Sequence, residues 1–134
     1  MALNNSSNFD FRDVGIFLNE YSRKVDYLVE DTIYKVAKEA AKRLKNDEST
    51  PRKTGKYAKG WAAKQDKKNY SRIGVKHAIV YGKDGTYQLA HLLEHGHATR
   101  TGKRTKPIEH IAKAERWAVN EAYDRIMHEL EAAP

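Results

Sequence analysis

The sequence predicts an α+β fold with a long N-terminal helix, an antiparallel sheet of three or four strands, a short helix and a C-terminal helix. Apolar residues recur at helical spacing near the start of the chain and again near its end. Between these two stretches, short segments rich in aromatic and β-branched residues are separated by polar turns. The chain has 134 residues, so we expect residues 1–134 to form a single domain.

Composition and charge restrict the class of function. The chain has no cysteine, which excludes disulfides and thiolate metal sites. It shows neither a signal peptide nor an apolar stretch approaching the ~20 residues of a membrane span, so we expect synthesis in the cytoplasm and no membrane association. The net charge of +7 divides into +1 over residues 1–45, +8 over residues 46–110 and −2 over residues 111–134. This distribution predicts an acidic partner for the middle of the chain, either nucleic acid or a protein surface.

The first element is a helix over residues 13–45, preceded by a loose N-terminus at residues 1–12 and an N-cap at Asp13. At 1.5 Å per residue, a helix of roughly 30 residues spans about 45 Å, which is more than a small domain can cover. We therefore expect it to pack against a neighbouring subunit, with interface residues Phe17, Tyr21 and Leu28. The alternative is an ordinary core helix with frayed ends.

Residues 54–106 are expected to hold the sheet, a short helix and a basic loop. Tyr57–Gln65 and Tyr70–Tyr81 have strand composition and are joined by the polar turn Asp66–Asn69. Alternation in the second segment places four side chains on one face, namely those of Ile73, Val75, His77 and Ile79. We expect His77 to be half-buried and hydrogen-bonded, and not a metal ligand.

The tight turn Gly82–Gly85 leads into a short helix at Tyr87–His95, which Gly96 ends in the left-handed conformation. The segment Thr99–Lys106 has no apolar periodicity, and we expect a mobile surface loop or a hairpin tip there. Its cations, which we expect to contact a partner or DNA, are Arg100, Lys103, Arg104 and Lys106. The last helix covers residues 107–131 and starts at Pro107.

The string from His91 to His95 matches the H-x-x-E-H pattern of inverted zinc proteases. On a helix the two imidazoles and Glu94 would share one face, and His97 could supply a further ligand. However, Gly96 ends the helix directly after the string, and a histidine near a helix C-terminus complements the dipole there without a metal. We therefore expect no cofactor, and should a metal bind, the candidate ligands are His91, His95 and His97.

Two short motifs lie between the long helices. A Pro-x-x-Thr-Gly segment at residues 51–55 precedes a tryptophan, and a Leu-x-x-x-x-Glu-x-Gly-His signature at residues 89–97 precedes the basic loop. The motif residues are Thr54, Gly55, Trp61, Leu89, Glu94, Gly96 and His97. In this order and spacing, residues 13–130 resemble the small neck and tail-component proteins of long-tailed bacteriophages. The chain departs from the family pattern at Tyr57, where leucine is common, and at Gly60, where serine is common.

The resemblance implies a structural virion protein without catalysis, located at the head–tail junction. It would join head to tail, or complete the tail, as part of an oligomeric ring, with further copies of itself and neighbouring head-connector and tail proteins as partners. Glu94 and His97 would then hold the fold by satisfying backbone groups near Gly96. Two alternatives stay open: a basic nucleic-acid-binding protein that uses the central region, and a small metal-dependent hydrolase built on His91, Glu94 and His95.

Overall fold

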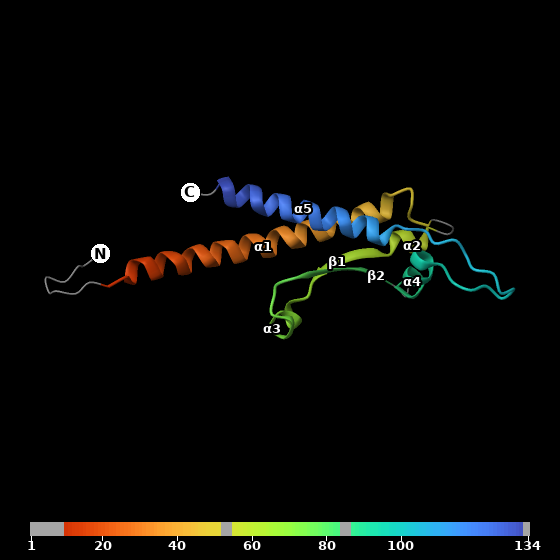
Figure 1. Ribbon diagram of the computed structural model, residues 1–134, viewed down its shortest axis with the longest axis horizontal. Coiled ribbons are helices and arrows are strands. Elements are labelled where there is room, and N and C mark those ends of the chain that lie inside the picture. The colour runs from red at the N-terminus through yellow and green to blue at the C-terminus, as the bar shows by residue number, and fades with distance from the viewer. Residues whose placement is uncertain (1–9, 52–54, 84–86, 133–134) are drawn as a thin grey trace.

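The computed structural model describes residues 10–51, 55–83 and 87–132, which form an elongated α+β molecule (Figure 1). Helix α1 lies between helix α5 on one side and a two-stranded sheet on the other. The main elements are α1 (Arg12–Asn46), β1 (Trp61–Gln65), β2 (Ala78–Gly82), α4 (Tyr87–His95) and α5 (Ile111–Ala132). Three short helical turns complete the described part: α2 (Lys56–Lys59), η1 (Lys67–Asn69) and α3 (Tyr70–Ile73).

Helix α1 confirms the predicted long N-terminal helix, with 35 residues. It begins at Arg12, so Asp13 lies in the first turn and the prediction of Asp13 as N-cap is wrong. The carboxylate of Asp10 accepts a hydrogen bond from the Arg12 backbone N–H instead. All buried residues of α1 lie between Thr32 and Leu44, and its first turns project past the C-terminal end of α5 (Figure 1).

The core lies where the second half of α1 meets α5 and the sheet. Its buried centre comprises Ala41, Leu44, Tyr57 and Trp61, with Ala63, Val80, Ala90, Leu93, Ile111 and Ala114 packed against it. Alanines on α1 leave room for the sheet and α5 to approach the helix closely. Outside this core, the Arg125 guanidinium binds the Glu39 carboxylate at 2.6 Å and ties α5 to α1.

The sheet has two antiparallel strands within the described residues, and not the three or four that we expected. Trp61 pairs with Gly82, and Gln65 pairs with Ala78. The first strand is shorter than predicted because Lys56–Lys59 form a helical turn after Gly55, whose φ is 77°. This turn buries both Tyr57 and Ala58.

The second predicted strand is also wrong over its first half. Residues 70–73 form helix α3, which ends at Gly74 with φ 88°, and the strand begins at Ala78. Ile73 and Val75 therefore precede the strand and are exposed, by 49% and 60%, so they do not share a strand face with Ile79 as predicted. The hydrogen bond from the Gly74 N–H to the Tyr70 carbonyl closes this turn and prevents the extended conformation.

His77 precedes β2 and is half-buried and hydrogen-bonded, which confirms that prediction. Its Nε2 lies 2.8 Å from Asp66 Oδ2. A hydrogen bond to the Val75 carbonyl and this carboxylate raise the pKa of His77, while two bonds from Asn69 and the one from His77 lower the pKa of Asp66. The expected turn Asp66–Asn69 is thus a compact loop that holds the sheet end together.

Some predictions fall on residues outside the described ranges. These are the loose N-terminus up to residue 9, Thr54, and the middle of the turn at residues 82–85. Helix α5 begins at Ile111, four residues after Pro107, so Pro107 does not start it. The intervening residues connect back to α4, because the Ile108 N–H donates to the Leu93 carbonyl at 2.9 Å.

Candidate functional site

The segment that carries the H-x-x-E-H string folds as α4 followed by a hairpin. Gly96 has φ 73°, which confirms the predicted helix end. A Cβ at this position would lie 2.6 Å from the Thr105 carbonyl oxygen, so the returning strand of the hairpin also needs a glycine here. The hairpin crosses back through an isolated bridge between Ala98 and Arg104 and a bond from the Thr105 N–H to the His97 carbonyl.

Glu94 is buried and caps the N-terminus of α5. Its Oε1 accepts from the backbone N–H groups of His110 and Ile111, and its Oε2 accepts from that of Ala112, each at 2.9 Å. The first N–H groups of a helix have no partner within the helix, and a carboxylate there also complements the helix dipole. Glu94 therefore joins α4 to α5, and the backbone groups that it satisfies belong to residues 110–112 and not to the neighbours of Gly96 in the chain, where we had expected its partners.

The pKa of Glu94 reflects two opposed effects. Burial disfavours the charged carboxylate and raises its pKa, but the hydrogen bonds from three backbone N–H groups lower the pKa by more, so it lies below its usual 4.5. The carboxylate is therefore ionised in the folded protein at neutral pH. All three donors are fixed by the start of α5, so Glu94 is held as a structural anion.

His110 completes a buried polar cluster that the sequence interpretation did not find. Its Nδ1 lies 2.7 Å from the Ile108 carbonyl oxygen and 3.0 Å from Glu94 Oε1. Both oxygens are acceptors, so Nδ1 carries a proton, and in the neutral imidazole Nε2 then accepts the hydrogen bond of the Tyr57 hydroxyl at 2.7 Å. Burial and the charge of Glu94 raise the pKa of Tyr57 to about 12, which keeps this hydroxyl a donor.

A sequence signal for His110 existed but was weak. It stands directly before the apolar run of the last helix, which is where an N-cap residue belongs, but histidine is not a usual N-cap residue. The rings of Tyr57, Trp61 and His110 pack edge to face, with centroids 5.6 to 6.5 Å apart. Trp61 thus lies in the core, whereas Leu89 of the same predicted motif set is exposed on α4.

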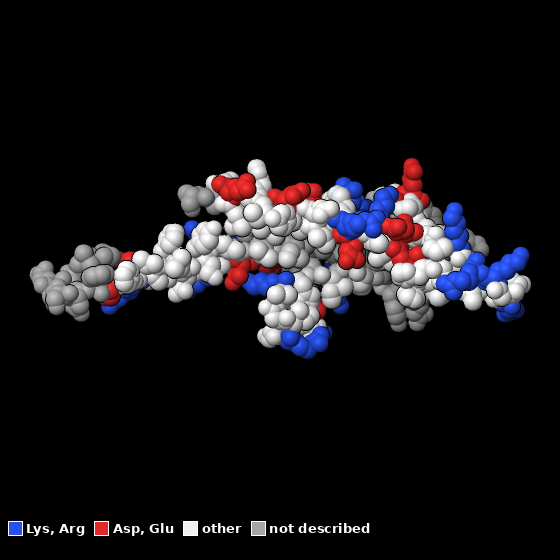
Figure 2. Space-filling view, in the orientation of Figure 1, with Lys and Arg blue, Asp and Glu red and all other residues white. Residues whose placement is uncertain are grey.

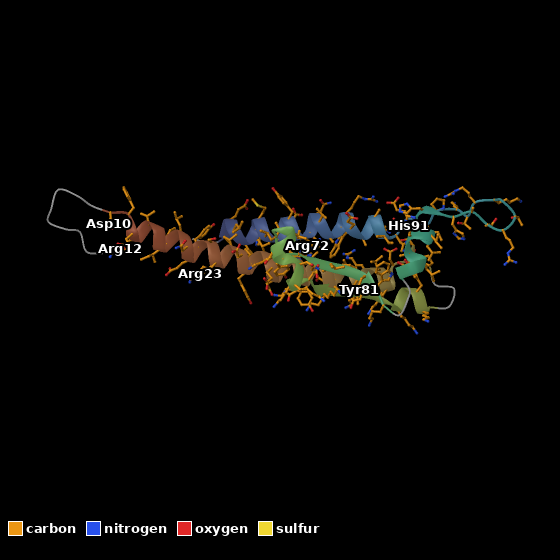
Figure 3. The ribbon with its side chains drawn as sticks, turned by 90° about the horizontal axis from the view of Figure 1, so that it is seen from below. Asp10, Arg12, Arg23, Arg72, Tyr81 and His91 are labelled. Carbon is orange, nitrogen blue, oxygen red and sulfur yellow. The ribbon has the colours of Figure 1, made fainter. Side chains whose placement is uncertain are left out.

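The three candidate metal ligands do not converge with Glu94. His91 and His95 are exposed on α4 with ring centroids 4.8 Å apart, and Figure 3 shows where His91 lies. The Nδ1 of His97 lies 3.2 Å from the Thr105 hydroxyl on the hairpin. Within the described residues, no group of three or more histidine, aspartate or glutamate side chains has a geometry that could hold a metal ion.

The basic loop is a hydrogen-bonded hairpin tip. The Thr99 N–H donates to the Lys103 carbonyl at 2.6 Å, and Gly102 turns the chain with φ 84°. Arg104 donates to the Gly96 carbonyl at 3.3 Å. The other cations, Arg100, Lys103 and Lys106, are exposed and make no ion pair with any described residue. Their charges are therefore available to a partner.

The three predicted interface residues line one groove. It has a volume of about 250 Å³ and lies between the first half of α1 and the C-terminal end of α5. Phe17 and Tyr21 are exposed beside it, and Leu28 lies half-buried at its inner end. An apolar groove at the end of a helix that projects from the core is a candidate contact surface.

Comparison with known proteins gives one family match. A family model described as "Bacteriophage HK97-gp10, putative tail-component" matches residues 13–96, which include all but the first residue of α1, the sheet and α4. No curated protein and no solved structure matches the chain. Among the described helices, none is both long and apolar enough to cross a membrane.

Proposed function

The chain belongs to the HK97-gp10-like family of bacteriophage tail components, and from this membership we propose that it is a structural subunit of the phage neck. In this proposal it joins head to tail or completes the tail as part of an oligomeric ring. Its partners are further copies of itself and the neighbouring head-connector and tail proteins. It resides in the virion after synthesis in the host cytoplasm.

The observation that carries this proposal is the uncovered first half of α1. Phe17 is 61% exposed, and Val14, Ile16, Leu18 and Tyr21 are exposed beside it. A monomer gains nothing from so many apolar side chains in water, whereas a subunit interface would bury them. At roughly 25 cal/mol per Å² of buried apolar surface, covering two aromatic rings alone contributes several kcal/mol to association.

The position of Glu94 argues against the alternative of a metal-dependent hydrolase. A general base must reach a metal-bound water, but both oxygens of Glu94 already accept hydrogen bonds from the start of α5. Elemental analysis of the purified protein tests this. One tightly held zinc per chain that is lost in His91→Gln would contradict a purely structural role for the string.

The proposed function is tested by complementation of a phage that lacks this gene. We expect the variant Phe17→Ser with Tyr21→Ser to fold normally, because both residues lie outside the core, yet to yield few joined heads and tails by electron microscopy. The matched control is Tyr27→Ser on the same helix, since Tyr27 is 71% exposed but does not line the groove. Normal numbers of complete particles from the double variant would contradict the proposed interface.

A further inference from the structure

The two ends of this elongated molecule carry opposite charge. From Arg12 to Asp31, α1 holds five carboxylates and three cations, and from Glu121 onward α5 holds four carboxylates and one cation. At the opposite end, residues 96–106 hold four cations and no carboxylate, and α2 adds Lys56 and Lys59. Figure 2 shows Lys and Arg gathered at the hairpin tip and Asp and Glu along the C-terminal part of α5, with both kinds of charge over the middle of the molecule.

The groove at the acidic end has the chemistry of a cation site. Its apolar lining consists of Phe17, Tyr21, Val25, Leu28 and Leu130. Glu20 and Glu129 line it from the two helices, together with Lys24. Aromatic faces beside carboxylates suit a guanidinium, which stacks on rings and donates hydrogen bonds in its plane.

The hairpin at the basic end presents exposed cations that are complementary to this groove. Its tip is preorganised by the bond between Thr99 and Lys103, so little ordering is needed for it to bind. Arg100 and Lys103 project from it with no ion pair to any described residue. The long stems of such side chains can also cover apolar surface while their charged ends reach carboxylates.

We propose that the hairpin of one copy docks into the α1–α5 groove of the next copy. Arg100 lies against Phe17 and Tyr21, and Glu20 and Glu129 receive the cations of the hairpin. This inference rests on the proposed function and names the partner of both surfaces as a second copy of this chain. A contact between two different surfaces is heterologous, and its repetition produces rings or chains.

Paired charge reversals test this contact. The first variant is Arg100→Glu with Lys103→Glu, and the second is Glu20→Lys with Glu129→Lys; all four residues are exposed, so both variants should fold. At an ionic strength of about 0.01 M, where screening is weak, we expect the wild type to self-associate in sedimentation velocity. Each variant alone should associate at least about tenfold more weakly, because like charges then face each other.

An equimolar mixture of the two variants decides the matter. The reversed hairpin of the first variant fits the reversed groove of the second, and the remaining two surfaces are native, so the mixture should recover association. The control is Lys67→Glu with Lys68→Glu on η1. It changes the net charge by the same amount as the hairpin variant, but we expect it to associate like the wild type. Together these results would identify the groove and the hairpin as mutual partners.

Three outcomes would overturn the inference. These are a wild type that stays monomeric at low salt at every concentration, single variants that associate normally, and a mixture that fails to recover. If the hairpin reversal abolishes binding to a DNA duplex and leaves self-association intact, the partner is DNA. The proposed function is judged separately, by the count of joined particles, and would survive all of these results if Phe17 and Tyr21 remain essential there.

Discussion

At the scale of single residues, Glu94 determines how the C-terminal helix is attached. Glu94 lies in the last turn of α4, beside the sheet, and its carboxylate accepts hydrogen bonds from the first N–H groups of α5, which packs on α1. His110 lies beside this carboxylate, and its other ring nitrogen is hydrogen-bonded to the Tyr57 hydroxyl. These buried polar contacts connect α4, the segment before α5, α5 itself and α2. Breaking one of the contacts should therefore lower the stability of the fold.

We expect Glu94→Gln to lower the free energy of unfolding by about 1–3 kcal/mol at pH 7, since an amide satisfies fewer of the three donors. The pKa of Glu94 is depressed in the folded protein. Its stabilising effect is therefore fully present above the unfolded pKa of 4.5 and is lost as pH falls through the folded pKa. Urea denaturation from pH 7 to pH 3 measures both effects.

The acid sensitivity should shrink in Glu94→Gln without vanishing. Asp47 keeps a pKa of about 2 through its bonds from Ser49, and Asp66 keeps a lowered pKa, so both still destabilise the folded protein when protonated. If the free energy of unfolding of Glu94→Gln falls with decreasing pH as steeply as that of the wild type, protonation of Glu94 does not contribute to the acid sensitivity.

The Tyr57 hydroxyl gives a second prediction at this scale. Tyr57→Phe keeps the packed ring but leaves the buried Nε2 of His110 without its donor. We expect a loss of about 1–3 kcal/mol in thermal or urea unfolding, which is the usual cost of an unsatisfied buried polar group. Tyr123→Phe on the exposed face of α5 is the matched control and should change stability by less than about 0.5 kcal/mol.

At the scale of elements, glycines decide where helices end and the chain turns back. Gly96 ends α4 and Gly102 turns the hairpin, and both have positive φ. They differ in their surroundings, because a Cβ at Gly96 meets the Thr105 carbonyl, whereas a Cβ at Gly102 meets nothing within 4 Å. The left-handed conformation therefore accompanies a close backbone contact at Gly96 and an open turn at Gly102.

This difference predicts unequal effects of alanine. Gly102→Ala should cost only the strain of a left-handed residue, about 1–2 kcal/mol at most. Gly96→Ala should cost clearly more, because the 2.6 Å approach to the Thr105 carbonyl forces the hairpin away from α4. Thermal unfolding of the two variants side by side gives the comparison, and equal losses would show that the contact is not tight in solution.

At the scale of the whole molecule, stability and assembly are carried by different regions. The core joins the second half of α1 to α5 and the sheet, while the projecting half of α1 and the hairpin lie at opposite ends (Figure 1). Changes at either end should therefore alter assembly without unfolding the protein.

We expect replacement of Arg100, Lys103, Arg104 and Lys106 by Ser to leave the melting temperature within a few degrees of the wild type, since all four are exposed. The same variant should block the joining of heads to tails. Differential scanning calorimetry and particle counts by electron microscopy measure the two results. Wild-type numbers of joined particles would reduce the hairpin to a solubilising loop.

Much of the secondary structure could be read from local pattern. The long α1, the short α4 with Gly96 at its end, and the existence of α5 follow from apolar spacing and from glycine, which depend on neighbouring residues alone. The strands were predicted less well. The composition of residues 57–65 and 70–81 favours extended strands. However, a short helix follows Gly55 and another ends at Gly74, so both strands are shorter than predicted. The packing of Tyr57 against His110 outweighs strand propensity there.

The sequence by itself determined the helical frame, the basic hairpin segment and the family resemblance that the family match bears out. The tertiary structure alone decided that Glu94 caps a helix that begins 17 residues later in the chain, that His110 is buried beside its carboxylate, and that half of α1 is left uncovered. Periodicity reports which face of an element is apolar, but not which segment covers that face. The sequence likewise does not reveal which backbone N–H groups donate to the carboxylate of Glu94. The positions of these groups depend on how the connecting chain folds back.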